Sequence, residues 1–192
     1  MTSPVIGFIG LGLMGGNMVE NLQKKNFKPI VMDLNPDAVA AVVARGGSEA
    51  SSAAELAAAS DIIMLCLTTS SVVEMVMHGD DGILAGIKEG AVVIDFGTSI
   101  PASTRQLGAE LAKKGAGMVD AALGRTPAHA KDGLLNIMAA GEQATFDSVK
   151  PLIDLQGENV FHMGALGAGH ETQFLNTFMG MSTVCAMYQA FK

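Results

Sequence analysis

A short apolar run, Val5 to Ile9, leads directly into Gly10-Leu11-Gly12-Leu13-Met14-Gly15 and then into a helical pattern. A dinucleotide-binding turn requires this order of strand, glycine-rich turn and helix. Gly10 permits the tight turn, Gly12 lets the backbone approach a pyrophosphate, and Gly15 lets the helix pack closely on the strand. We therefore predict that residues 10–15, including Leu13 and Met14, bind a dinucleotide. The alternative is a glycine-rich corner with no ligand.

An acidic residue ends the next apolar run. Asp33 lies 18 residues after Gly15 (33 minus 15), close to the spacing of about 20 expected for a residue that binds the adenosine ribose. Its carboxylate would accept hydrogen bonds from the ribose hydroxyls and repel a 2′-phosphate. Leu34 and Asn35 follow without a basic residue, so NAD is favoured over NADP. Asp33 could instead cap the helix that starts near Pro36, but Asn35 already fills that role.

Composition limits the classes of partner. The net charge is −7 with only 12 Lys and Arg residues, which argues against a nucleic-acid partner. A hydrophobic content of 49% and a charged content of 16% indicate a deeply buried α/β protein. The two cysteines, Cys66 and Cys185, favour a reducing cytoplasm over a disulfide framework. The N-terminus has no positively charged segment typical of a signal peptide, so we expect a cytoplasmic protein.

Apolar runs alternate with helical patterns, which predicts a Rossmann-type doubly wound, mainly parallel sheet covered on both faces. Ser52-Ala53-Ala54-Glu55 has the spacing of a capping box, and Pro101 occupies a first helical position. We expect residues 122–133 to form a long irregular stretch, where function tends to sit. The predicted strands are 5–9, 30–33, 61–67, 91–96, 117–121, 134–140 and 159–163.

The last segment is a different kind of helix. Residues 172–191 carry no charge and reach the length of about 20 that could span a bilayer. Polar residues interrupt the segment, so we expect a buried or subunit-interface helix and no membrane span. An apolar stripe at helical spacing predicts a homodimer or higher oligomer through this helix. The stripe consists of Phe174, Phe178, Met181, Cys185 and Tyr188.

Four sequence blocks occur in this order along the chain: VIGFIGLGLMGGNM, DIIMLCLTTSSVVEMV, DFGTSIP and DAALGRTPAHAKDGLL. Together they resemble the β-hydroxyacid dehydrogenases, the 3-hydroxyisobutyrate dehydrogenase family. The resemblance implies that Leu67, Thr68 and Val72 lie near the cofactor and Thr98 near its nicotinamide half and the substrate. It also implies an NAD-binding domain, 1–165, followed at 166–192 by the start of the long interdomain helix of an all-α domain that is otherwise absent. The chain would then be a fragment or a natural short form.

The fourth block departs from the commonest family form. Gly124-Arg125-Thr126 stands where the family has Ser-Gly-Gly, and this variant resembles the 3-sulfolactaldehyde reductase branch. The resemblance implies that Gly124, Arg125 and Thr126 hold an anionic head group. A guanidinium beside glycine N–H groups forms a suitable fork for an anion. Other small anionic acids would fit the same fork, and a surface arginine without a ligand is the alternative.

A second departure lies at GAGHETQFLNT, residues 167–177, where the family pattern is GxGxxxKxxNN. Gln173 occupies the position of the family's catalytic lysine, Asn176 matches its first asparagine, and Thr177 replaces the second in the substrate site. In the family, the lysine donates a proton to the carbonyl oxygen. Loss of general acid catalysis typically costs about 10²- to 10⁴-fold in rate, so the chain would be slow, inactive or altered.

These features favour an NAD-linked oxidoreductase that interconverts a small anionic β-hydroxy acid, or its sulfonate analogue, with the aldehyde. Asn176 would orient the reacting oxygen. The alternatives are an NAD-binding module without turnover, a 3-hydroxyisobutyrate dehydrogenase, and a fold for another ligand such as a sugar nucleotide. The four histidines lack metal-ligand spacing, so we expect no metal and solvated or capping roles for each. They are His78, His129, His162 and His170.

Overall fold

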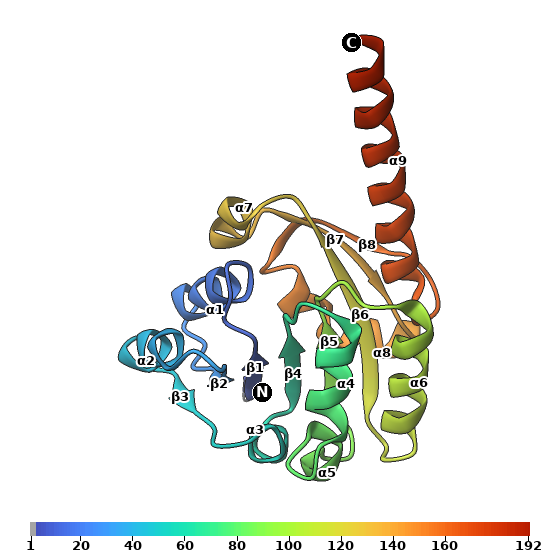
Figure 1. Ribbon diagram of the computed structural model, residues 1–192. Coiled ribbons are helices and arrows are strands. Elements are labelled where there is room, and N and C mark those ends of the chain that lie inside the picture. The colour runs from blue at the N-terminus through green and yellow to red at the C-terminus, as the bar shows by residue number, and fades with distance from the viewer. Residues whose placement is uncertain (1–2) are drawn as a thin grey trace.

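An eight-stranded sheet forms the centre of the protein, in a computed structural model that describes residues 3–192 (Figure 1). Its strand order is β3-β2-β1-β4-β5-β6-β7-β8, and the first six strands follow the Rossmann order. Neighbouring strands run parallel except for β6 and β7. The predicted fold class is confirmed; residues 1 and 2 of the predicted first domain lie outside the described range. The strands are β1 (Ile6–Ile9), β2 (Ile30–Met32), β3 (Ser48–Glu49), β4 (Ile62–Leu65), β5 (Val92–Asp95), β6 (Gly117–Gly124), β7 (Leu135–Ala140) and β8 (Gly157–His162).

Helices cover both faces of the sheet. The core accordingly divides into two apolar clusters, one with α1, α2 and α8 and the other with α3 to α6. The helices are α1 (Gly15–Lys24), α2 (Pro36–Ala44), α3 (Ala53–Ala59), α4 (Ser70–His78), α5 (Ile83–Gly86), α6 (Pro101–Ala112), α7 (Pro127–Asp132), α8 (Gln143–Ile153) and α9 (Ala168–Ala190).

Strand β4 shows why the central strands are continuous apolar runs. Ile62 and Met64 belong to one cluster, whereas Ile63 and Leu65 belong to the other. Successive side chains of a strand point to opposite faces of the sheet, so a strand with helices on both sides buries all of its residues. This burial is the physical origin of the strand pattern in the sequence.

Local capping agrees with the sequence. The side chain of Asn35 accepts a hydrogen bond from the N–H of Asp37 at 3.0 Å, and Oγ of Ser52 accepts one from the N–H of Glu55 at 3.1 Å. Pro101 is the first residue of α6. These contacts satisfy N–H groups that the first turn of a helix leaves without partners, and they confirm the predicted helix starts.

One strand was missed and one local expectation was wrong. Strand β3 was not predicted, because Ser48 and Glu49 are polar and exposed, and the strand exists only through its pairing with β2. The stretch 122–133 is not irregular throughout. Its beginning continues β6 as far as Gly124, which pairs with β7, and its end forms α7.

Helix α9 leaves the domain as a projecting rod, with the C-terminus at its far end (Figure 1). Its buried residues, Gly169 and His170, both lie in the first turn, and residues 174–192 are exposed. The predicted apolar stripe is therefore open along its length in this single chain, and the predicted oligomer remains a prediction. No helix in the described range is both long and apolar enough to cross a membrane.

We predict that Gly15→Ala destabilises the protein by about 1–3 kcal/mol or more. A Cβ at this position would lie 1.9 Å from the carbonyl oxygen of Gly10, so the glycine-rich turn or α1 would have to move. The measurement is the free energy of unfolding in urea.

Gly180→Ala is the matched control, because a Cβ there meets nothing within 4 Å. In the interior of an exposed helix this change should stabilise by about 0.5–1 kcal/mol. Equal unfolding free energies for the two variants would contradict the close approach of α1 and the turn.

Candidate cofactor and substrate site

The glycine-rich turn joins β1 to α1 at the carboxyl edge of the sheet. Gly10 has a φ of +99°, a value that favours glycine. A Cβ on Gly10 would lie 2.4 Å from the carbonyl oxygen of Cys66. Together with the close approach of Gly15 to Gly10, this contact fixes where α1 begins. Gly12 differs from both, since a Cβ there meets nothing within 4 Å and its outer side is open.

The backbone of this turn fits the pyrophosphate of a dinucleotide. Within residues 3–192, the N–H groups of Gly12, Leu13 and Met14 donate no backbone hydrogen bond, and no side chain caps α1. Free N–H groups at a helix N-terminus favour an anion through both hydrogen bonding and the helix dipole. The residues present therefore fit the cofactor that the sequence predicts.

Asp33 lies beside this turn at the end of β2. Its Oδ2 accepts a hydrogen bond from the N–H of Leu11, and its Oδ1 accepts one from the N–H of Asn35 at 2.8 Å. The carboxylate is therefore held next to the turn, where the sequence predicts a ribose. Leu34 follows with 98% of its surface exposed and lies at the same edge.

A cleft of about 300 Å³ opens next to the turn. It brings together segments that are distant in the sequence: the start of α1, the loops after β4 and β5, the end of β6, and α9. In an open α/β sheet, ligands bind outside the carboxyl ends of the strands, where the strand order reverses; here that point lies between β1 and β4. The lining residues are Met14, Cys66, Leu67, Thr68, Phe96, Gly97, Thr98, Leu123, Arg125 and Gln173.

Arg125 lines this cleft in an unusual backbone conformation. Its φ is +77°, in the left-handed region that is costly for residues other than glycine. Its Nη1 donates to the carbonyl oxygen of Leu134 at 2.6 Å and to Glu158 at 2.5 Å. In the described chain, Nη2 and Nε make no hydrogen bond, so part of the guanidinium can still receive an anion.

Gln173 reaches the cleft from α9. Its Nε2 donates to the carbonyl oxygen of Leu123 at 3.2 Å, which joins α9 to the end of β6. Asn176 and Thr177 follow three and four residues later, so they lie on the same side of the helix, but both are exposed and neither lines the cleft.

Of the predicted cofactor and substrate residues, Leu67, Thr68 and Thr98 line the cleft with Met14 and Arg125. Val72 lies in the first turn of α4, where its N–H bonds the Thr69 side chain. Gly124 and Thr126, predicted to hold the anionic group with Arg125, do not line the cleft. Thr126 precedes α7 and its Oγ1 lies 2.8 Å from Nδ1 of His129, and Gly124 ends β6.

Cys66 places a thiol in the lining of the cleft. Burial raises its pKa to about 12, and the nearby charge of Asp95 contributes in the same direction. A thiol with this pKa is almost entirely protonated near neutral pH and is therefore a poor nucleophile. Cys66 forms part of the wall.

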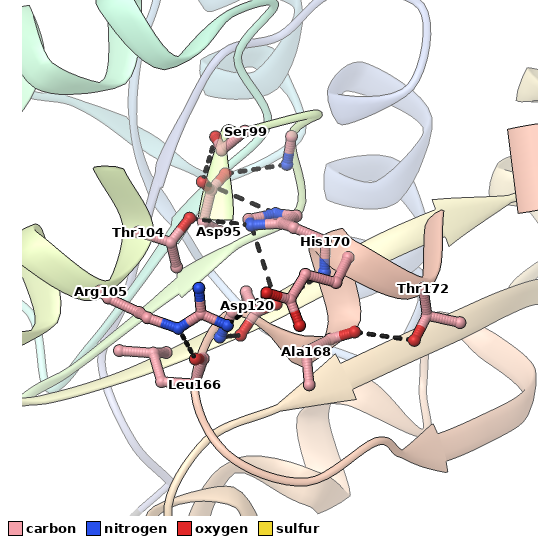
Figure 2. Close-up of polar contacts among 12 residues, drawn as sticks. Asp95, Ser99, Thr104, Arg105, Asp120, Leu166, Ala168, His170 and Thr172 are labelled. Carbon is pink, nitrogen blue, oxygen red and sulfur yellow. Dashed lines mark hydrogen bonds and ion pairs between the residues drawn. The ribbon is translucent and has the colours of Figure 1, made fainter. Parts of the chain in front are cut away.

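The structure contains a buried polar cluster beneath the cleft that the sequence did not predict. It contains Asp95 at the end of β5, Asp120 in β6 and His170 in α9 (Figure 2). The expectation that His170 is solvated or caps a helix end was therefore wrong, because its side chain is fully buried. Two aspartates within buried apolar strands were the available signal, since buried carboxylates require donors.

The other histidines lie elsewhere. His78 pairs with Glu110 on the surface, and the ring of His162 stacks on Phe146 with centroids 4.6 Å apart. Among the residues that the structure covers, no group of three or more His, Cys, Asp or Glu side chains is placed to hold a metal ion.

The order of the sheet and the position of the cleft define a Rossmann-type nucleotide-binding domain. Residues 5–164 match the sequence profile described as the NAD binding domain of 6-phosphogluconate dehydrogenase. The chain belongs to this family, and NAD is confirmed as the cofactor of the domain.

The chain is similar to proteins of the kind that its sequence blocks resemble. The chain is 37% identical to 2-(hydroxymethyl)glutarate dehydrogenase from Eubacterium barkeri over 91% of its length, and 32% identical to 3-sulfolactaldehyde reductase from Escherichia coli over 92%. It spans only 58% and 59% of those two proteins. The solved 3-hydroxyisobutyrate dehydrogenase from Mycobacterium tuberculosis, with L-serine, superposes with a TM-score of 0.92 at 27% identity, covering 99% of this chain and 64% of that one.

We predict that Arg125→Gly is more stable than Arg125→Ala by about 1–2 kcal/mol. Both variants lose the pair with Glu158, but only glycine adopts a φ of +77° without strain. Urea unfolding of the two variants measures the difference directly.

The same two substitutions at Gln106, within α6, provide the control. There the order should reverse, with alanine more stable than glycine by about 1 kcal/mol, because the backbone is helical. If the free energy of unfolding of Arg125→Ala equals or exceeds that of Arg125→Gly, the left-handed conformation is not imposed by the fold.

Proposed function

We propose that this chain is the cofactor-binding and substrate-binding part of an NAD-dependent oxidoreductase that interconverts a small anionic β-hydroxy acid, or a sulfonate analogue, with its aldehyde. One observation carries the proposal: a single cleft brings Thr98, Arg125 and Gln173 beside the start of α1. An anion site and a hydrogen-bond donor thus lie next to the cofactor turn. The relatives of known activity support this class of reaction.

The cofactor's phosphates bind the free N–H groups from Gly12 to Met14, and Asp33 accepts the hydroxyls of the adenosine ribose. A 2′-phosphate would meet the charge of Asp33 with no basic residue at Leu34 or Asn35. We therefore assign NAD in preference to NADP. When bound, NAD supplies the nicotinamide carbon that accepts or donates hydride.

The substrate lies in the cleft between Arg125, on one wall, and Thr98, on the other. The unpaired nitrogens of Arg125, with Gly124 and Thr126 beside them, bind the anionic group. Thr98 positions the nicotinamide ribose and the substrate from the opposite wall.

Residues of α9 act on the reacting oxygen. Gln173 donates a hydrogen bond to it. Asn176 and Thr177, one turn further along the same side of α9 and outside the cleft itself, would orient it from there. A glutamine amide donates hydrogen bonds, but it carries no positive charge and is too weak an acid to transfer a proton, so the reaction runs without general acid catalysis by this side chain. We therefore propose a slow reaction.

Two alternatives rest on specific observations. The presence of Gln173 where the family has its catalytic lysine also fits an NAD-binding module without turnover. The similarity to 3-hydroxyisobutyrate dehydrogenase fits 3-hydroxyisobutyrate as the substrate in place of a sulfonate.

Two further features bear on assembly and location. The exposed apolar side of α9 supports a homodimer or higher oligomer through this helix. The two free thiols, Cys66 and Cys185, support a reducing cytoplasm.

The first test is cofactor affinity, measured by NADH fluorescence. The chain should bind NADH more tightly than NADPH, and Asp33→Asn should lose roughly tenfold or more in NADH affinity, because a charge-assisted hydrogen bond contributes about 1.5–3 kcal/mol. Asp37→Asn, which removes an equal charge in the first turn of α2, should keep the wild-type affinity. A folded chain that binds neither nucleotide would overturn the proposal.

The second test is turnover. With sulfolactaldehyde or methylmalonate semialdehyde, Gln173→Lys should raise the rate of NADH oxidation by about 10²- to 10⁴-fold, the typical contribution of a general acid. Gln189→Lys, which adds the same charge near the outer end of α9, should leave the rate unchanged. Equal rates for wild type and Gln173→Lys would argue that the missing lysine is not what limits turnover.

A further inference from the structure

Asp95 and Asp120 are neighbours in the sheet. Their Cα atoms are partners in the parallel pairing of β5 with β6, and neither residue is exposed. The first turn of α9 places the side chain of His170 between them (Figure 2). Three titratable groups therefore share one buried site beneath the cleft.

Each carboxylate orders a different wall of the cleft. Asp95 accepts hydrogen bonds from the N–H of Gly97 at 2.8 Å and from Oγ of Ser99 at 2.6 Å, and so fixes the loop that carries Thr98. Asp120 accepts the N–H groups of Gly167 at 2.7 Å and His170 at 2.8 Å. It therefore caps the turn of α9 that leads to Gln173.

The imidazole of His170 lies between these two arrangements. Its Nδ1 is 2.9 Å from Oγ1 of Thr104, in α6, and 3.7 Å from Oδ2 of Asp120. Its Nε2 is 3.9 Å from Oδ2 of Asp95 and is the buried side-chain nitrogen that lacks a hydrogen-bond partner within the described residues. Buried polar atoms without a partner are uncommon in folded proteins, and this one faces the carboxylate that holds the Thr98 loop.

We propose that His170 is a positioning residue that sets the separation of the Thr98 and Gln173 walls of the cleft. This inference rests on the proposed function, because it assigns the nicotinamide half of NAD to the space between those walls. Gln173 follows His170 by three residues, close to one helical turn. A shift of His170 toward Asp95 therefore also moves Gln173 relative to Thr98.

The test compares two nucleotides by calorimetric titration. NADH fills both the glycine-rich turn and the cleft, whereas ADP-ribose lacks the nicotinamide. His170→Phe keeps a ring of similar size and removes both nitrogens. It should weaken NADH binding about tenfold, the equivalent of about one hydrogen bond, and leave ADP-ribose binding within about twofold of wild type.

Two amide variants separate positioning from packing. In Gln the amide lies near the position of Nε2, and in Asn it lies near that of Nδ1. His170→Gln should recover NADH affinity to within about threefold of wild type, a difference of about 0.7 kcal/mol, and His170→Asn should not. His78→Phe, on the surface beside Glu110, is the control and should bind both nucleotides as wild type does.

If His170→Phe does not fold, the comparison of His170→Asn with His170→Gln carries the test, because only the Asn variant should weaken NADH binding selectively. Equal losses for NADH and ADP-ribose, or equal affinities for wild type and the folded variant, would overturn the positioning role. A wild-type chain that binds neither nucleotide would instead overturn the proposed function on which this role rests.

Discussion

Two buried carboxylates side by side in neighbouring strands are the constraint around which the functional edge of this protein is organised. Asp95 and Asp120 have no access to water, and burial raises the pKa of Asp120. Such groups are tolerated only when donors surround them. The donors come from the loop after β5 and from the start of α9. Satisfying the two aspartates therefore determines where both walls of the cleft lie.

The cofactor half of the site depends on a different kind of contact. Around Gly10 and Gly15 the backbone of the turn lies so close to the loop after β4 and to the start of α1 that a side chain would not fit. The N–H groups that face outward are therefore rigidly held and unpaired. The cofactor half is built from backbone, whereas the substrate half depends on individual side chains such as Arg125 and Gln173. The two halves can accordingly change independently.

The sequence predicted what depends on burial and backbone. Continuous apolar runs marked seven of the strands, and glycines with a following acid marked the turn and Asp33. It could not predict β3, whose polar residues pair only because β2 is beside them. Side-chain partners distant in the chain were also out of reach. Arg125, just after β6, meets Glu158 of β8 across β7. His170 meets Asp95 only after α9 docks, although an aspartate ending a buried strand was a usable signal.

Helix α9 is attached only near its base. Its buried residues lie in the first turn, and its 23 residues extend about 35 Å at 1.5 Å per residue. A rod fixed at one end acts as a lever: a tilt of roughly 5° about the base displaces the far end by about 3 Å over this length. Conversely, a force applied to the outer turns exerts a large torque on the first turn. Whatever packs on the outer part of α9 can therefore adjust the position of Gln173 with little force.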